Sequence, residues 1–395
     1  MTTSVQPPQV TRTTTPSDAP MISVIMPVRN EANHIHDTLT QIIKQDYPAD
    51  AFEVLVVDGE STDETRSIVE ALARKHPQIR LFTNPKRWSS AARNVGIQAA
   101  QGELLLIVDG HCHIPDEHLL DAVADAFDRS GADCLGRPQP QDVHNASPLQ
   151  KAIAAARSSW LGHHPASFIY SSEEQIVPAH SVAVAYRKEV FDEVGLFDES
   201  FDACEDVELN HRVDQASLRC LFTPKIAVHY EPRGSLRGLF RQLVRYGRGR
   251  IRLLRKHSET LSVASLVPAI FLLGLVFGLP LSFVTVPLAW IYWGVLGLYA
   301  FTVVAVSLGL AAFTQDWRMT LWAPIVFVTI HVATGWGLIR EAILPGRNPF
   351  AKPQAENTEP LLETHINQFS SSSRTAEPQA REQSQVSGVQ GRASV

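Results

Sequence analysis

An aspartate followed closely by two histidines is the first group of side chains in this sequence that could do chemistry. Asp109 ends the apolar run 104–108, and His111 and His113 come directly after it. A short apolar run beside a glycine predicts a strand buried on both faces, and ligands of open α/β sheets collect at the carboxyl ends of strands. A carboxylate and imidazoles there could hold a divalent metal ion, which could in turn hold a phosphate. The alternative is a strand-ending aspartate that makes a turn with Gly110.

Strand and helix patterns alternate around this group. We expect strands at 22–28, 52–58, 79–84 and 104–108, with helices over about 35–45, 63–75 and 89–100 between them. Strands and helices joined by short links predict a parallel, doubly wound sheet. Asp58 ends the second strand as Asp109 ends the fourth, so both carboxylates could face one crevice.

Other polar side chains fall at predicted strand ends or in the loops and helices that follow. Together they suit the binding of a charged nucleotide and the activation of a hydroxyl group: Glu31, Asp58, Asp63, Arg93, Asp109, His111, Glu205, Asp206, His229, Gln242 and Arg245. The sequence contains neither a GxxxxGK[ST] loop nor a GxGxxG turn, so nucleoside triphosphatase and dinucleotide-binding roles lose support.

The segment 261–343 has the composition of a membrane region. It is rich in Leu, Val, Phe and Trp and contains almost no charged residues. We expect about three transmembrane helices, two within 261–312 with a break at Gly278 and Pro280, and a third over 321–339.

The segment just before this block is strongly basic, although the whole chain carries a net charge of −6. Nine Arg and Lys residues and no acid lie between Arg233 and Lys256, with apolar residues among them. Such a segment is typical of an anionic membrane surface and predicts that the preceding domain lies in the cytoplasm. Nucleic-acid binding is the competing interpretation; because the basic run adjoins the membrane block, we expect a membrane partner and no nucleic acid.

Five motifs, in the same order, resemble those of the family 2 glycosyltransferases, which have the GT-A fold. SVIMPVRNEANHI resembles the first strand and P-x-x-N-E turn of that family, and VVDGESTDET resembles its V-D-D-x-S-x-D-x-T motif. AARNVGIQAAQGELLLIVDGHC is similar to the run that ends in D-x-D. EDVELNHRV and RQLVRY are similar to the E-D and Q-x-x-R-W motifs. The resemblance covers about 22–250, and the membrane block is similar to that of bacterial exopolysaccharide transferases of the succinoglycan type.

Composition and the resemblance together predict a domain organisation. A disordered arm, not a signal peptide, is expected over 1–20 and a GT-A catalytic domain, with a doubly wound mixed sheet, over 21–232. A basic interfacial segment over 233–260, transmembrane helices over 261–343 and a disordered tail over 344–395 would follow. The four cysteines show no paired spacing, which favours reduced thiols over disulfides or a zinc knuckle.

The resemblance also implies roles for the donor-side residues. A nucleotide diphosphate sugar, expected to be a UDP-sugar, would be bound with Mg²⁺ or Mn²⁺ held by Asp109 between the two phosphates. Asp58 would bond the uracil and Arg93 would lie near the sugar or diphosphate. The remaining donor-binding residues would be Pro27, Asn30, Glu31, Asp63, Gln242 and Arg245, the last two also reaching toward the acceptor.

Asp206, with Glu205 beside it, would be the general base. An inverting transfer needs one base for the acceptor hydroxyl and positive charge on the leaving diphosphate. A neighbouring carboxylate raises the pKa of a carboxylic acid, which suits a base that works near neutral pH. Glu205 could instead turn away as a helix cap.

The sequence departs from the family pattern at the metal motif. The usual D-x-D is Asp109-Gly110-His111, so the second carboxylate is missing. His111 could replace it as a ligand, which would favour Mn²⁺. The alternative is a metal held by Asp109, His229 and phosphate alone. Tyr246 stands where processive synthases of the family have Trp, which weakens the case for a polymerising enzyme.

These features predict an inverting, membrane-anchored glycosyltransferase of the plasma or inner membrane. It would move one sugar to a polyprenyl-diphosphate-linked saccharide at the cytoplasmic face, in exopolysaccharide or cell-envelope glycan synthesis. The alternatives are a processive polysaccharide synthase and a membrane protein that binds sugar nucleotides without turnover.

Overall fold

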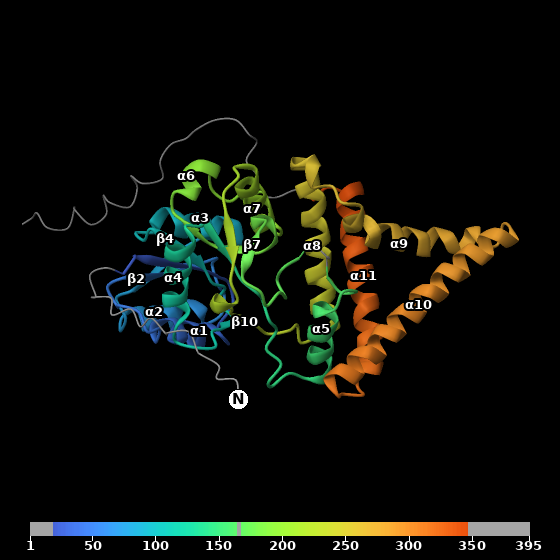
Figure 1. The fold of residues 1–395 in the computed structure, drawn as a ribbon, viewed down its shortest axis with the longest axis horizontal. Coiled ribbons are helices and arrows are strands. Elements are labelled where there is room, and N and C mark those ends of the chain that lie inside the picture. Colours follow the sequence, from blue (N-terminus) through green and yellow to red (C-terminus); the bar gives the residue numbers. More distant parts are fainter. Residues whose placement is uncertain (1–18, 164–166, 347–395) are drawn as a thin grey trace, which may run out of the picture. The chain divides into compact units, whose positions relative to one another are not determined.

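The computed structural model describes residues 19–163 and 167–346. The arm predicted over 1–20 and the tail predicted over 344–395 fall almost entirely outside these residues. The described chain forms an α/β part followed by long helices (Figure 1).

The α/β part is built on one sheet with the order β3-β2-β1-β4-β8-β6-β9-β7. The four strands that alternate with helices in the sequence, β1 to β4, are parallel, whereas β8 runs antiparallel to β4 and β7 antiparallel to β9. The predicted doubly wound mixed sheet is therefore confirmed. The strands are β1 Ile22–Val28, β2 Phe52–Asp58, β3 Ile79–Thr83, β4 Leu104–Ile107, β6 Cys134–Gly136, β7 Gln175–Val177, β8 Ala183–Arg187 and β9 Cys220–Phe222.

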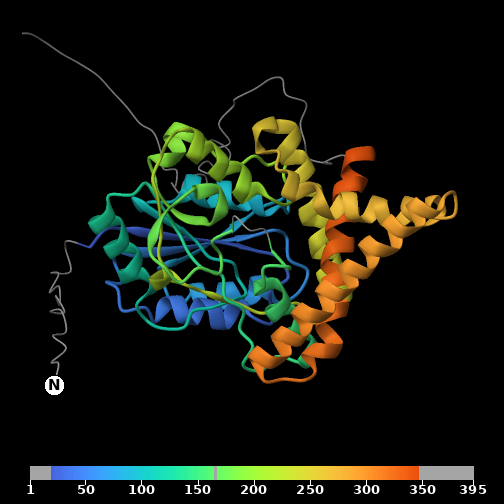
Figure 2. The same cartoon turned by 45° about the vertical axis from the view of Figure 1, so that its right-hand side comes forward.

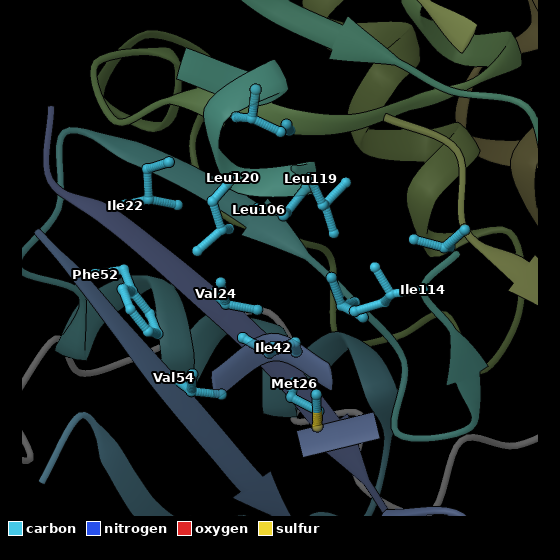
Figure 3. Close-up of a cluster of buried hydrophobic side chains, with 14 of the residues drawn as sticks. Ile22, Val24, Met26, Ile42, Phe52, Val54, Leu106, Ile114, Leu119 and Leu120 are labelled. Carbon is cyan, nitrogen blue, oxygen red and sulfur yellow. The ribbon is translucent and has the colours of Figure 1, made fainter. Parts of the chain in front are cut away.

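Alternate side chains of the central strands belong to two separate hydrophobic cores, one on each face of the sheet. Ile22, Val24 and Met26 of β1 pack toward α1, α2 and α4 (Figure 3). Ile25 packs toward α3, α6 and α7 on the other face. This follows from the two-residue period of a strand, which sends successive side chains to opposite faces. The helices are α1 Ile35–Ile43, α2 Thr65–Ala73, α3 Ser89–Ala99, α4 Leu119–Ser130, α6 Val190–Val194 and α7 Glu205–Gln215.

A separate two-stranded ribbon lies beyond the end of β4. It pairs β5 (Cys112–His113) with β10 (His229–Tyr230) in antiparallel register, Tyr230 opposite Cys112 and His229 opposite His113. The ribbon brings the segment after β9 next to the loop that carries Asp109, two regions that are far apart in the sequence.

Among the residues that the structure describes, three helices are long and apolar enough to cross a membrane: α9 Val263–Leu281, α10 Val286–Thr314 and α11 Met319–Ile343. The predicted set of about three apolar helices at this end of the chain is confirmed, which indicates a membrane protein. The predicted break at Gly278 and Pro280 is wrong. Helix α9 includes both residues, and the turn lies at 282–285, where Thr285 caps α10 by accepting a hydrogen bond from the amide of Leu288.

The basic segment forms one helix, α8 (Leu236–Lys256), which packs against α11 (Figures 1 and 2). The contact between α8 and α11 is close because both helices have glycines where they meet. A Cβ added to Gly247 would lie 2.5 Å from the Thr334 carbonyl oxygen, and one added to Gly337 would collide with the Val244 carbonyl. Glu341, which is 1% exposed, binds three arginines of α8: Arg248, Arg252 and Arg255.

Helix α8 is equally close to the loop that precedes α7. A Cβ on Gly249 would lie 2.6 Å from the Ala203 carbonyl oxygen and 2.8 Å from the Cys204 sulfur. Cys204 adopts the left-handed conformation at the N-cap of α7, with φ of 61°. Helix α8 therefore lies between α11 and the start of α7, with no space for a side chain at Gly247 or Gly249.

Helix α5 (Pro148–Ser158) falls in a region where the sequence pattern was irregular. Its N-cap Ser147 and Gln150 form a capping box, which satisfies backbone donors of the first turn. Ala152, Ile153 and Ala156 pack with α8 and α11. The helix thus belongs with the membrane-proximal helices.

Candidate active site

A cleft of about 630 Å³ opens at the carboxyl ends of β1 and β4. Its walls come from the loops after these strands, from α3, from the start of α7 and from α8. Nine of the sequence-predicted site residues line it: Pro27, Glu31, Arg93, Asp109, His111, Glu205, Asp206, Gln242 and Arg245. Asn30, Asp58, Asp63 and His229 do not.

Arg93 links the two acidic sides of the cleft. Its Nη1 donates to Glu205 Oε1 at 3.0 Å, and its Nη2 lies 4.0 Å from Asp109 Oδ1. Burial would lower the pKa of Arg93, but Glu205 and Asp109 outweigh it and raise the pKa. The guanidinium, packed over the Phe197 ring at 5.3 Å, is thus a fixed positive charge between the carboxylates.

The adjacent carboxylates at the start of α7 have different environments. Glu205 is buried and Oε1 accepts hydrogen bonds from Ser89 Oγ at 2.5 Å and from Arg93. Asp206 is exposed to the cleft, and its Oδ1 accepts only from the following amide, Val207 N, at 2.8 Å. The surrounding protein, and then the charge of Glu205, raise the pKa of Asp206. Glu205 does not act as a side-chain cap of α7.

Asp109 is partly open to the cleft and is held by a tyrosine. Its Oδ2 accepts a hydrogen bond from the Tyr230 hydroxyl at 3.3 Å. Burial, with the nearby Cys112 and Asp109, raises the pKa of Tyr230 well above its ordinary value, so the hydroxyl keeps its proton and donates. Arg137, which is 1% exposed, lies behind Tyr230 with Nη2 at 3.4 Å from the hydroxyl oxygen.

His111 lies beside Asp109 and is oriented by a third acid. Its Nδ1 lies 3.1 Å from Glu31 Oε1. Burial acts to lower the pKa of His111, but the hydrogen bond to Glu31 and the charges of Asp109 and Glu31 raise it. Because Glu31 engages Nδ1, Nε2 is the nitrogen left for a ligand. A carboxylate that orients an imidazole is common behind metal-bound histidines, so Asp109 and His111 fit a divalent metal ion.

Two of the predicted donor-binding residues hold the loops beneath the cleft together. The Asn30 side-chain oxygen accepts from the Thr62 amide at 2.8 Å, and Asn30 itself adopts a left-handed conformation. Asp63 accepts from the backbone amides of Ala32 and Thr65. These contacts tie the loop after β1 to the loop after β2.

Asp58 is 1% exposed at the end of β2 and does not line the cleft. It accepts hydrogen bonds from the Ser61 amide and hydroxyl, and Oδ2 lies 3.6 Å from Arg66 Nη1. The adjacent Gly59 lines the cleft in its place.

His229 is not brought together with Asp109. Successive side chains of a strand point to opposite sides, so Tyr230 faces Asp109 and His229 faces away. The His229 ring contacts the His113 ring instead, with 6.0 Å between centroids. Within the described residues, the candidate metal ligands at the cleft are therefore Asp109 and His111 without His229.

Several cleft residues were not singled out from the sequence: Ser89, Arg137, Arg157, Tyr230, Arg233 and Arg250. Tyr230 is next to His229, the residue predicted from the sequence. Which of the two side chains points into the cleft depends on which face of the two-residue strand β10 each one occupies. Arg137 follows the apolar strand residues 134–136, and an arginine at the end of a buried strand was an available signal.

Gln242 and Arg245 lie on the face of α8 that lines the cleft. Gln242 donates to the Tyr246 hydroxyl at 3.3 Å and accepts from Arg233 Nε at 3.3 Å. Arg157 of α5 also lines this end of the cleft. The wall nearest the apolar helices is therefore polar and basic.

Comparisons with known proteins agree with this geometry. A model of the family described as Glycosyl transferase family 2 matches residues 23–195. The succinoglycan biosynthesis protein ExoA of Rhizobium meliloti (strain 1021) is 31% identical over 330 residues, which are 81% of this chain and 94% of that protein. The chain belongs to glycosyltransferase family 2.

Another relative of this family 2 glycosyltransferase is the dolichyl N-acetyl-alpha-D-glucosaminyl phosphate 3-beta-D-2,3-diacetamido-2,3-dideoxy-beta-D-glucuronosyltransferase of Methanococcus voltae. It is 27% identical over 244 residues, 60% of this chain and 74% of that protein. The enzyme class predicted from the sequence, a glycosyltransferase of polysaccharide or glycan biosynthesis, is confirmed.

A solved structure shows the same fold. The mannosyltransferase PcManGT from Pyrobaculum calidifontis, in complex with GDP-Man and Mn²⁺, aligns with a TM-score of 0.51 and 22% identity. The alignment covers 81% of this chain and 88% of that chain. The GT-A fold of this family 2 glycosyltransferase is thus confirmed.

Proposed function

We propose that this glycosyltransferase moves one sugar, with inversion, from a nucleotide diphosphate sugar to a saccharide linked to a polyprenyl diphosphate. The proposal rests on one observation: three groups of residues line the same cleft. Asp109 and His111 lie at one side, Asp206 lies at the start of α7, and the basic helix α8 forms the wall toward the apolar helix α11.

The donor would bind on the β1 and β4 side of the cleft. Asp109 and His111 would hold Mn²⁺ or Mg²⁺, which supplies positive charge to the leaving diphosphate. One carboxylate and one imidazole favour Mn²⁺ over Mg²⁺, and the Mn²⁺ in the mannosyltransferase complex supports this choice. Arg93 would add a fixed positive charge on the same side. A UDP-sugar is the expected donor.

The acceptor hydroxyl would lose its proton to Asp206. This carboxylate is exposed to the cleft and has a raised pKa, two properties that suit a general base near neutral pH. Glu205 would position Arg93 and raise the pKa of Asp206 rather than take the proton itself, since Ser89 and Arg93 already occupy its Oε1.

A lipid-linked acceptor would approach along α8. Arg157, Arg233, Gln242 and Arg245 line this end of the cleft and offer donors to a diphosphate. The basic helix adjoins the three apolar helices, which supports a catalytic domain at the cytoplasmic face of the plasma or inner membrane. The kinship with a succinoglycan biosynthesis protein supports a role in exopolysaccharide or envelope glycan synthesis.

A donor panel tests this function. Membranes that contain the full chain are incubated with Mn²⁺, a lipid extract and one radiolabelled UDP- or GDP-sugar at a time. We expect one donor to label the lipid fraction, with a single sugar added and inverted at the anomeric carbon. Membranes with the Asp206→Asn protein are the matched control.

Three results would contradict the proposal. If the radiolabel stays in the nucleotide fraction with every donor, the chain does not have the transferase function proposed here. A long polymer would favour a processive synthase, and a product that does not partition with lipid would exclude the lipid-linked acceptor.

A further inference from the structure

Two histidines and a glutamate form a cluster outside the cleft, where α7 meets the turn between α8 and α9. His211 lies on α7, His257 follows the last residue of α8, and Glu259 lies in the short turn Ser258–Thr260. One possible ligand atom from each of the three lies within 4.8 Å of the other two. We call these residues the His211–His257 cluster.

His257 engages Glu208 through one of its two ring nitrogens. Its Nε2 lies 3.1 Å from Oε1 of Glu208, a fully buried carboxylate, so Nε2 carries the proton. Arg212 and Lys256 already balance the charge of Glu208, at 2.9 Å and 2.8 Å. Glu208 is thus satisfied by three donors, and Nδ1 is the His257 nitrogen on the side of Glu259.

That nitrogen faces a carboxylate oxygen. Nδ1 of His257 lies 3.7 Å from Glu259 Oε1, and the same oxygen lies 2.9 Å from Nε2 of His211. The two rings are 4.7 Å apart between centroids and only 13% and 16% exposed, so two imidazolium ions there would repel each other. Glu259 Oε1 also accepts a hydrogen bond from Gln215 Nε2 at 2.8 Å, and the two imidazoles and the carboxylate converge on one point, where they can share a cation.

We propose that the His211–His257 cluster binds a divalent transition-metal ion, for which Zn²⁺ is the best chemical match. Two imidazoles and one carboxylate are a common zinc ligand set, and water fills the remaining position. Glu208 behind His257 is the outer carboxylate that orients such a ligand. Glu259, half exposed, leaves the site open to ions from solvent.

Such a metal would have a structural role rather than a catalytic one. Helix α7 begins with Glu205 and Asp206, whereas His257 and Glu259 lie between the basic helix and α9. The metal would fasten the helix of the proposed base to the segment that leads into the first apolar helix. It is distinct from the metal proposed at Asp109.

Metal titration of the full chain tests this site. The protein is purified in detergent with an affinity tag free of histidine and carries Asp109→Asn, so that the cleft does not contribute. Co²⁺ is added, its visible absorption is followed, and Zn²⁺ is then used to displace it. We expect one equivalent of Co²⁺ with a tetrahedral spectrum, displaced by Zn²⁺, and a higher melting temperature with Zn²⁺.

Single substitutions locate the bound ion. His211→Ala and His257→Ala should weaken binding by about tenfold or more and remove the thermal shift. Glu259→Gln keeps the size of an exposed side chain, so it tests the site even if a histidine variant does not fold. His36→Ala, at an exposed ion-paired histidine of α1, is the control and should bind as the parent does.

Two outcomes would overturn the proposal. One is no saturable Co²⁺ or Zn²⁺ binding at millimolar metal, which would leave the cluster as an ion-paired network. The other is binding that the cluster substitutions do not change. Neither readout uses sugar transfer, so failure here is separate from failure of the proposed function.

Discussion

The Tyr230 hydroxyl donates a hydrogen bond to Oδ2 of Asp109, with 3.3 Å between the two oxygen atoms. The other carboxylate oxygen, Oδ1, faces Arg93 at 4.0 Å. Tyr230 is itself backed by the buried guanidinium of Arg137. One oxygen of Asp109 is therefore fixed by the protein, and the carboxylate has a defined orientation in the cleft.

Removal of the Tyr230 hydroxyl should weaken metal binding at Asp109. In the Tyr230→Phe protein we expect about a tenfold rise in the Mn²⁺ concentration needed for half-maximal transfer, because an outer residue that orients a ligand is lost. Tyr47→Phe, whose hydroxyl bonds the Pro20 carbonyl away from the cleft, is the control. An unchanged Mn²⁺ requirement would show that Tyr230 does not orient a metal-binding Asp109.

Asp206→Asn should abolish transfer while donor binding persists. We expect the turnover number to fall by roughly 100- to 10,000-fold, the usual contribution of a general base. Nucleotide binding, measured by calorimetry with Mn²⁺, should stay within about twofold because Asp206 faces the acceptor side. Asp192→Asn on α6 is an exposed control. Turnover near the parent rate would exclude Asp206 as the base.

The pH profile of transfer should report the raised pKa of Asp206. The base must be ionised, so activity is lost as pH falls through its pKa in the folded protein. Because the surrounding protein and Glu205 raise that pKa, the acid limb should lie above the ordinary aspartate value of about 3.9. Glu205→Gln removes the neighbouring charge and should move the limb to lower pH. A limb that stays in place would contradict the coupling between the two carboxylates.

Glu341→Gln should destabilise the contact between α8 and α11. The substitution leaves three arginines, Arg248, Arg252 and Arg255, without their shared carboxylate, and breaking a buried ion pair costs roughly 3 kcal/mol. Thermal unfolding in detergent should show a lower melting temperature than for Glu193→Gln, an exposed substitution on α6. Equal melting temperatures would mean that the ion pairs of Glu341 add no stability.

Much of the fold follows from local patterns in the sequence. The strand predicted over 52–58 matches β2 residue for residue, and its end is marked where the apolar run 54–57 meets Asp58 and Gly59. The turn between α9 and α10 was misplaced because Pro280 removes only one amide donor and α9 ends one residue later, at Leu281. The signal that ends the helix is the Thr285 cap.

The cleft was harder to predict because it is made by contacts distant in sequence. Motif positions identified Arg93, Asp109 and Asp206, which do lie in one cleft. Asp58 ends a strand as Asp109 does, but Ser61 and Arg66 take up its oxygens locally. The choice of His229 over Tyr230 depended on the register of a two-residue ribbon, and no periodicity can be read from so short a strand.

Gly247 and Gly249 place α8 against α11 on one side and against Ala203 and Cys204 on the other. A helix held on both sides cannot slide, so the distance between the proposed base at the start of α7 and the apolar helix α11 is fixed. If the acceptor is anchored in the lipid, the enzyme then selects acceptors whose reacting hydroxyl lies at one fixed distance from the lipid. Synthetic lipid-linked acceptors of increasing saccharide length should show one preferred length, and equal rates for all lengths would contradict this.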